Sequence, residues 1–320
     1  MSKKTKIWLV TAFSLTLIGC IIFAGVMTLL KWDFTKLSTE KLETNNYEIS
    51  GNYKDISITT DTADVTFEIC NETKTSVKCF EPKNIKHLVS VKDGTLMIKV
   101  IDNRKWYEYI GIFSGSPKIT VYIPQGEYGA LKLCGSTGDV KIPKNLKFEN
   151  IDISQSTGNV TNFASATKSI NIKTSTGDIL TQNIFANSLK LSVSTGKITA
   201  YNISGSDTFE FNVSTGKTQI TDIKCKNLIS SGNTGNITMK NVIATEKFSV
   251  KRTTGKVRFE NCDASEIFME TDTGNVIGSL LSDKVFITNT DTGNINVPKT
   301  TIGGKCEITT DTGDIKITVN

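Results

Sequence analysis

The sequence predicts an all-β protein whose main body is a β-solenoid, a parallel β-helix-like rod of about ten coils. Three observations lead to this fold: a Thr-Gly pair recurs every 19 or 20 residues, apolar columns keep its register, and a small or polar residue precedes every pair. A fixed period of this length is typical of stacked supersecondary units and not of an ordinary globular domain. The threonines of the ten pairs are Thr137, Thr157, Thr176, Thr195, Thr215, Thr234, Thr254, Thr273, Thr292 and Thr312.

The apolar columns place a strand on each side of the glycine. One apolar residue lies six positions before each Thr, and a second lies four positions before it in most coils. A third follows two positions after the glycine in every coil except one, which has Thr218 there. Such alternation is the period of a strand with one buried face. We therefore expect each coil to run strand, glycine corner, strand, turn and strand. The first column comprises Leu131, Ile151, Ile170, Leu189, Phe209, Leu228, Phe248, Ile267, Phe286 and Cys306.

Backbone geometry explains the glycine itself. A residue without a Cβ adopts positive φ at little cost, which lets the chain turn sharply between two short strands. The residue before each Thr is Ser, Asn, Thr or Asp, and such residues hydrogen-bond their own backbone at corners. Coils stacked at about 4.8 Å give a rod roughly 45 Å long, whose stability is a sum over neighbouring coils.

The N-terminal segment predicts a membrane anchor. Residues 7–30 carry no charge, follow a lysine-rich cytoplasmic tail at residues 1–6, and exceed the length needed to cross a bilayer core. They are expected to be an uncleaved, single-pass signal anchor in the cell membrane, with the body extracytoplasmic. A cleaved signal peptide is an alternative, and Leu17–Cys20 looks like a lipobox whose cysteine would be lipidated. Ten apolar residues after Cys20 argue against lipidation.

Composition narrows the classes of partner and site. The net charge is +5, but the first 32 residues hold four lysines and no acidic residue, so the rest of the chain carries +1. A near-neutral body lacks the basic surface of a nucleic-acid binder. Seven cysteines without a CxxC pair and one histidine, His87, predict neither a zinc site nor a thioredoxin-type motif. His87 is expected to be structural, and Cys70 and Cys79 are near enough to bridge across a hairpin if geometry allows.

The remaining chain divides into three segments. Residues 31–46 are predicted to be a polar stalk, residues 47–130 a β cap, and residues 131–320 the solenoid repeats. Ile56–Val65 copies the repeat with alanine in the glycine position, so it is predicted to form a degenerate first coil. Asp93-Gly94 between two apolar runs predicts a hairpin. Terminal repeats of solenoids are atypical because they cover the exposed core, and we expect the cap to do so here.

Four features occur together in residues 47–320: the strand with Ala63-Asp64-Val65, the hairpin at Asp93–Leu96, the strand that ends at Ile123-Pro124, and the coils that spell Ser-Thr-Gly-Asp or Ser-Thr-Gly-Asn. This combination resembles a bacterial family of "putative adhesins", which are extracytoplasmic β-solenoids also described as a domain of unknown function. The resemblance implies the same fold and a place in the cell envelope, and some relatives accompany envelope-stress systems. It brings no catalytic residues.

Asp272, Asp291 and Asp311 each begin an Asp-Thr-Gly triplet, which is the signature of aspartic proteases. Those enzymes need two such carboxylates in one cleft, whereas here the same position is Ser in five other coils. Stacked coils would align the three aspartates in a ridge with oxygen ligands for a calcium ion, but the tandem glycine-rich calcium signature is missing. We therefore expect a solvated ridge, and no catalytic residue, cofactor or metal site.

Two features predict contact with partners. The densest aromatic patch of the body, Trp106, Tyr107 and Tyr109, suits contact with a membrane surface, a glycan or a peptide, and the alternative is a loop packed over the end of the solenoid. The chain ends at Asn320 without a helix or a polar cap. Residues 314–320 are therefore expected to present an open strand edge for end-on self-association or capture of a partner strand.

These observations predict a membrane-anchored extracytoplasmic β-solenoid that serves as an adhesin-like binding or structural module of the cell envelope, without catalytic activity. The expected partner is a cell-envelope component, a glycan or a membrane protein. Two alternatives stay open. One is a polysaccharide-active β-helix enzyme, which needs acidic and basic residues converging in a groove, and the other is an envelope-stress sensor or regulator.

Overall fold

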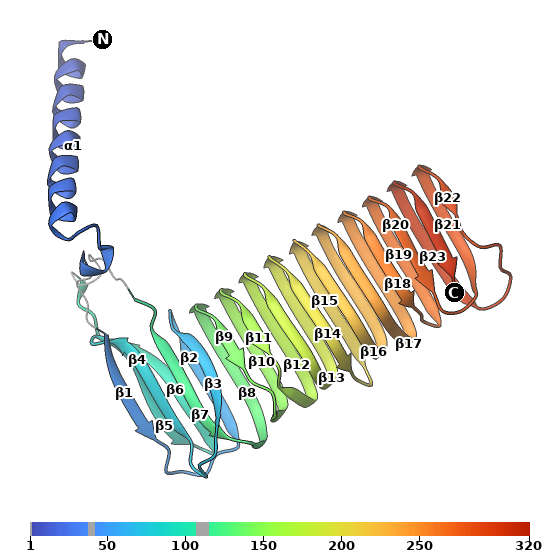
Figure 1. Cartoon of the computed structure of the whole chain (residues 1–320), viewed down its shortest axis with the longest axis horizontal. Coiled ribbons are helices and arrows are strands. Elements are labelled where there is room, and N and C mark those ends of the chain that lie inside the picture. The colour runs from blue at the N-terminus through green and yellow to red at the C-terminus, as the bar shows by residue number, and fades with distance from the viewer. Residues whose placement is uncertain (1, 38–41, 107–114) are drawn as a thin grey trace.

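The structure, a computed structural model, describes residues 2–37, 42–106 and 115–320. A long helix, α1 (Lys3–Leu29), and a short 3-10 helix, η1 (Phe34–Leu37), precede an elongated β body (Figure 1). In the described residues this body is one 24-stranded sheet wound into a rod. The β-solenoid predicted from the repeats is confirmed.

Strands begin earlier than the expected stalk allows, because β1 starts at Leu42. The strands of the N-terminal layer are β1 (Leu42–Glu48), β2 (Asp55–Thr60), β3 (Asp64–Cys70), β4 (Ser76–Pro82), β5 (Ile85–Lys92), β6 (Thr95–Asp102) and β7 (Lys118–Pro124). The strands of the regular coils are β8 (Gly126–Thr137), β9 (Val140–Ile142), β10 (Leu146–Thr157), β11 (Val160–Asn162), β12 (Ser165–Thr176), β13 (Ile179–Thr195), β14 (Ile198–Ser204), β15 (Thr208–Thr215), β16 (Thr218–Thr234), β17 (Ile237–Thr254), β18 (Val257–Cys262), β19 (Glu266–Thr273), β20 (Val276–Leu280), β21 (Lys284–Thr292), β22 (Ile295–Asn296), β23 (Gly304–Thr312) and β24 (Ile315–Val319).

The N-terminal layer continues the rod and then closes it. β2 lies parallel to β8, with Ile56 beside Leu131, and β3 lies parallel to β9, with Val65 beside Val140. β6 pairs parallel with β2, and β7 pairs parallel with β3. The outermost strands pair antiparallel: β5 with β6, and β4 with both β7 and β1. The change from parallel to antiparallel pairing marks the end of the regular stack.

The predicted apolar columns line the interior of the rod. Every member of the column that begins at Leu131 is buried except Phe286, and neighbouring members such as Leu131 and Ile151 lie side by side in adjacent coils. Burial of one such side chain stabilises the fold by about 1.5–3 kcal/mol relative to exposure. Each coil therefore depends on the coils above and below it.

The corner glycines have positive φ, as expected, and a second reason to be glycine. At Gly235 φ is +127°, and a Cβ would lie 1.8 Å from the carbonyl oxygen of Gly216 in the preceding coil. The Gly235 N–H donates to the carbonyl oxygen of Thr254 in the following coil at 2.8 Å. The corners therefore form a column of backbone in direct contact, which leaves no room for a side chain.

A second column of corner residues, not predicted from the sequence, lies six positions after the glycines. Its members are Asn or Asp with φ of 50–55°, a left-handed conformation that these two residue types tolerate. Asn202 Nδ2 donates to Asn183 Oδ1 at 2.8 Å, and Asn241 Nδ2 donates to Asp222 Oδ1 at 2.7 Å. We call this column, Asn183, Asn202, Asp222, Asn241 and Asn261, the asparagine ladder.

The last three coils do not stack in chain order, so the expectation that residues 314–320 form the open end is wrong. β23 lies between β19 and β21, and β24 lies between β20 and β22. The chain builds β21 and β22 one layer outward and then returns through residues 297–303 to fill the gap (Figure 1). The outermost layer is residues 284–296, which we call the terminal coil.

A buried arginine crosses the apolar interior. Arg252 is fully buried, and Gly232 in the preceding coil makes space for it, because a Cβ there would lie 1.8 Å from Arg252 Nη1. The guanidinium donates to Val213 O and to Thr218 Oγ1, both at 2.8 Å. Burial lowers the pKa of Arg252 to about 10. The side chain thus joins coils that are not neighbours in the stack.

The corner geometry predicts the effect of Gly235→Val. A β-branched residue at positive φ, together with the clash against Gly216, is expected to lower the free energy of unfolding by about 3 kcal/mol or more. Urea unfolding of the full chain in detergent, followed by circular dichroism, measures the change. Lys217→Val at an exposed position beside the adjacent corner is the control and should cost less than about 0.5 kcal/mol. Equal losses in the two variants would contradict the role given to the corner.

Candidate binding site

A groove of about 710 Å³ lies beside the asparagine ladder. After each ladder residue the next side chain points into the core, as buried Ile203 does. The residue after that lines the groove in three coils, as Ser204, Lys224 and Ile243. The lining consists of four ladder members and of polar and aliphatic residues that follow them: Asn202, Ile203, Ser204, Asp222, Lys224, Asn241, Ile243, Asn261 and Leu281.

The chemistry of this groove repeats along the rod. An amide or carboxylate recurs in each coil, so these groups are spaced at about 4.8 Å, the distance between neighbouring strands. Ile243 and Leu281, the latter 46% exposed, add apolar surface, and Lys224 adds a positive charge. Such a surface can hold an extended ligand by repeated hydrogen bonds and apolar contacts.

A second hollow, of about 540 Å³, lies in the N-terminal layer beside Tyr53 and Tyr128. The two rings stack with centroids 6.2 Å apart, and Tyr128 also packs on Phe148 at 5.8 Å. The Tyr128 hydroxyl donates to Pro124 O at 2.8 Å, and the Tyr53 hydroxyl is hydrogen-bonded to Thr75. Burial raises the pKa of both phenols. Because both hydroxyls already have partners, this stack serves mainly to close the core next to Phe148.

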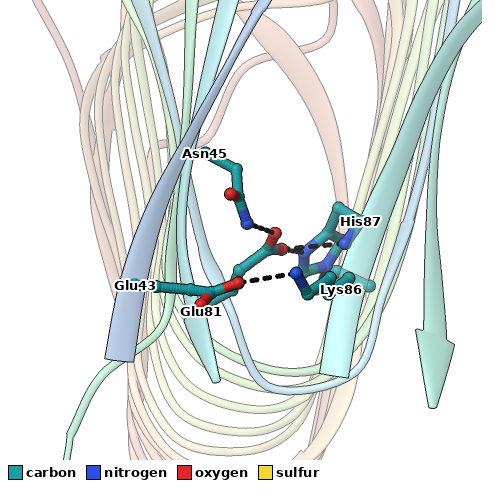
Figure 2. Close-up of polar contacts among 6 residues, drawn as sticks. Glu43, Asn45, Glu81, Lys86 and His87 are labelled. Atoms are coloured by element: carbon teal, nitrogen blue, oxygen red, sulfur yellow. Dashed lines mark hydrogen bonds and ion pairs between the residues drawn. The ribbon is translucent and has the colours of Figure 1, made fainter. Parts of the chain in front are cut away.

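A buried polar cluster closes the interior between β1, β4 and β5 (Figure 2). Glu81 Oε2 accepts hydrogen bonds from the backbone N–H of His87 at 2.8 Å and lies 2.6 Å from its Nδ1. Asn45 Nδ2 donates to Glu81 Oε1 at 2.7 Å. Burial raises the pKa of Glu81, but the hydrogen bonds from His87 and Asn45 outweigh burial and hold it below its ordinary value of 4.5. Nearby, Lys86 pairs with Glu43 at 2.6 Å across the two edge strands.

His87 therefore has partners that the sequence did not reveal. Its Nε2 lies 3.0 Å from Thr60 Oγ1, so Thr60, His87 and Glu81 follow the order hydroxyl, imidazole and carboxylate of a hydrolase triad. All three are buried, with Thr60 4% exposed, and they do not line either hollow described above. The arrangement satisfies polar groups inside the cap, which agrees with the structural role expected for His87.

Cys79 lies beside this pair. In the described part of the chain, Cys79, Glu81 and His87 are the one group of metal-ligating side chains whose ligand atoms all lie within 4.8 Å. Burial, with a contribution from Glu81, raises the pKa of Cys79 to about 12, so the sulfur is a thiol. The hydrogen bonds that join Glu81 to His87 and Asn45 satisfy the buried polar atoms beside this thiol. Cys70 and Cys79 are both free thiols.

On the other side of the glycine corners from the acidic ridge, the residues that follow the glycines link the coils. Asn275 Oδ1 accepts the backbone N–H of Asp314 at 3.1 Å, and Asp314 Oδ1 accepts the backbone N–H of Asn294 at 2.8 Å. These oxygens link consecutive coils of the actual stack. Asp272, Asp291 and Asp311 do not form a metal-ligating group within the described residues.

The predicted aromatic surface is only partly described. Trp106 is 78% exposed, which suits a contact surface, whereas Tyr107 and Tyr109 lie outside the described residues. The groove beside the ladder was not predicted. The residues that line it beside the ladder differ from coil to coil, so no repeat marks them. The ladder itself does repeat in the sequence, because Asn or Asp stands six positions after each glycine from Gly177 to Gly255.

The polar cluster predicts a pH-dependent effect of Glu81→Gln. The amide should lower the free energy of unfolding by about 2 kcal/mol at pH 7, because it places a donor against donors in a buried site. The pKa of Glu81 is lower in the folded than in the unfolded state, so the stability it contributes is present at neutral pH and is lost as the pH falls below 4.5.

Urea unfolding of the full chain across this pH range should therefore show the difference between wild type and Glu81→Gln narrowing in acid. Glu43→Gln, which breaks the more exposed pair with Lys86, is the matched control and should have a smaller effect. A constant difference at all pH values would show that the charge of Glu81 is irrelevant to the fold.

Comparison with solved structures finds several chains of low identity. A "putative lipid binding protein" from Parabacteroides distasonis is 22% identical, with a TM-score of 0.49, over 75% of this chain and 95% of that chain. A "putative adhesin" from Bacteroides fragilis is 16% identical, with a TM-score of 0.45, over 87% and 97% of the two chains. A "putative adhesin" from Parabacteroides merdae is 12% identical, with a TM-score of 0.36, over 75% and 97%.

No curated protein matches the chain. The family described as Toastrack DUF4097 matches it twice, at residues 53–209 and at residues 206–320. These two matches cover the cap and the coils, which are the segments that carry the resemblance found in the sequence. The chain belongs to the Toastrack DUF4097 family.

Proposed function

We propose that the protein is a membrane-anchored, extracytoplasmic binding module of the cell envelope, adhesin-like and without catalytic activity, whose ligand is an envelope polymer held in the groove beside the asparagine ladder. The observation that carries the proposal is the repetition of that groove. Each coil adds one amide or carboxylate at the coil spacing, next to the half-buried Ile243 and the exposed Leu281. A polymer with its own repeat meets similar contacts in successive coils.

The anchoring part of the proposal rests on α1. This helix has 27 residues and a mean hydropathy of 2.3 over its most apolar window, and Met27 is its one buried residue. At 1.5 Å per residue it is longer than the bilayer core of about 30 Å. Lys3, Lys4 and Lys6 precede the apolar run and favour a cytoplasmic N-terminus, which puts the body outside.

The single carboxylate in the groove lining favours binding over polysaccharide hydrolysis. Glycoside hydrolases place two carboxyl groups on either side of the scissile bond. Asp222 is the one carboxylate among the residues that line the groove, and its Oδ1 accepts a hydrogen bond from Asn241. The groove offers contacts in series, and its lining supplies no partner carboxylate for an acid and base pair.

A double variant in the groove tests the proposal that the groove binds the ligand. Lys224→Glu combined with Leu281→Ser should weaken binding of the full chain to purified bacterial cell walls by about tenfold or more, because it removes the cation and an apolar contact. The measurement is co-sedimentation of detergent-solubilised protein with the walls. Lys217→Glu makes the same charge change on the same coil at the glycine corner and should bind like wild type. Equal binding by all three proteins would exclude the groove.

Protease treatment of intact cells tests the topology. External protease should remove the body of the uncleaved protein and leave α1 in the membrane fraction, because a spanning helix is protected by the bilayer. Mass spectrometry of the purified protein should find residues 1–30 still present. A mature chain that starts after the apolar run would show a cleaved signal peptide in place of the signal anchor. A mature chain that starts at a lipid-modified Cys20 would show a lipid anchor.

A further inference from the structure

The polar cluster of the N-terminal layer brings together three side chains of the kinds that bind metal ions. Cys79 and Glu81 stand two positions apart on β4, so both point into the interior, and His87 reaches them from β5 after the turn at residues 83–84. The sulfur, a carboxylate oxygen and a ring nitrogen of the three side chains all lie within 4.8 Å of one another. Cysteine sulfur, histidine nitrogen and carboxylate oxygen are the protein ligands of zinc.

Burial and charge suit a divalent cation at this place. Cys79 and Glu81 are 0% exposed and His87 is 3% exposed, so bulk water does not compete for the three ligands. A thiolate and a carboxylate together carry two negative charges, which a divalent cation neutralises. Neutrality matters here because an uncompensated charge is costly in a buried site.

Neighbouring polar groups already orient two of the three ligands (Figure 2). Asn45 Nδ2 donates to Glu81 Oε1 at 2.7 Å, and the backbone N–H of His87 donates to Glu81 Oε2 at 2.8 Å. On the far side of the imidazole, His87 Nε2 lies 3.0 Å from Thr60 Oγ1. A hydroxyl accepts as well as donates, so Thr60 can accept the Nε2 proton and leave the lone pair of Nδ1 for a metal ion. Such outer contacts are typical of zinc ligands.

Hydrogen bonding explains the burial of Glu81 and His87 but gives no role to the sulfur of Cys79. Within the described structure the hydrogen bonds of this cluster join Glu81 to His87 and Asn45, and His87 to Thr60. A metal ion would give the sulfur a partner as well. Cys225 is also a buried free thiol, but it does not belong to a metal-ligating group of the described residues.

We propose that Cys79, Glu81 and His87 bind one zinc ion through Sγ, a carboxylate oxygen and Nδ1. The ion replaces the thiol proton of Cys79 and the proton between Glu81 Oε2 and His87 Nδ1, and both protons leave to solvent. Those two atoms are 2.6 Å apart and must separate to about 3.3 Å, because each ligand atom of a tetrahedral zinc ion lies about 2 Å from the metal. A solvent molecule supplies the fourth ligand.

The position of the site indicates what the ion does. In the described structure β4 pairs with β1 and β7, whereas β5 pairs with β6, so the ligands link two strands that share no ladder. The ion therefore fastens the layer that closes the rod. Because the ligands are buried, the ion enters while this layer folds, and its binding stabilises the folded layer. This role is independent of the groove.

Metal content of the full chain tests the proposal. Untagged protein from cells grown with added zinc, purified in detergent, should hold about one zinc ion per chain by plasma mass spectrometry. Protein from cells grown with cobalt should show a sulfur-to-cobalt charge-transfer band in the near ultraviolet, because the metal bonds to the Cys79 sulfur. Cys79→Ser should lose the band and hold at least about tenfold less metal. Cys225→Ser makes the same change at another buried cysteine and should keep both.

A further variant separates loss of the ion from loss of the fold. Thr60→Val keeps all three ligands and should weaken zinc binding by about 10- to 100-fold in competition with a chelator, while circular dichroism stays that of the wild type. Lys224→Glu combined with Leu281→Ser should hold zinc like the wild type. The proposal is overturned if the wild type carries no zinc, if its cobalt form lacks the band, if Cys79→Ser keeps the ion, or if Thr60→Val binds zinc as tightly as the wild type.

Discussion

Close approach of the backbone at the glycine corners is the constraint on which the rest of this structure depends. A Cβ on Gly158 would lie 2.0 Å from the carbonyl oxygen of Gly138, and the same contact recurs along the stack. Because each glycine N–H also donates to the threonine carbonyl of the next coil, as Gly158 does to Thr176 at 2.9 Å, the strands on either side stay in register over many coils. The apolar columns and the asparagine ladder are aligned by the same register, which also sets Ser204 beside Lys224 in the groove lining.

Several polar groups enter the interior at positions where another coil supplies a hydrogen-bond partner. Thr174 Oγ1 donates to the corner carbonyl of Gly158 at 3.1 Å, and Gln155 Nε2 donates to that of Gly138 at 2.9 Å. Arg252 takes the same position in its own coil but reaches a carbonyl further down the rod. A buried donor without an acceptor costs about 1–3 kcal/mol, so these contacts limit which residues the position accepts.

The features that could be predicted from the sequence, such as the glycine corners and the apolar columns, are those that recur at the same position relative to the Thr-Gly pair. Stacking order is different, because Thr292 and Thr312 stand at equivalent positions and either could lie beside Thr273; the structure pairs Thr273 with Thr312. The choice depends on whole layers and on the path of residues 297–303, which no local pattern reports. The groove was missed for a related reason, since Ser204 and Lys224 occupy one phase with unlike side chains.

The out-of-order stacking also governs how this rod can change length in evolution. In a solenoid stacked in chain order, a coil can be gained or lost at the end of the chain with one interface disturbed. Here loss of residues 304–320 would remove one layer and leave the outermost layer without its pairing partner, because β21 and β22 each pair only with strands of that segment in the described structure. A coil added after Asn320 would start from inside the stack, where Asn320 already bonds to Asn261. Growth is therefore confined to duplication within the array.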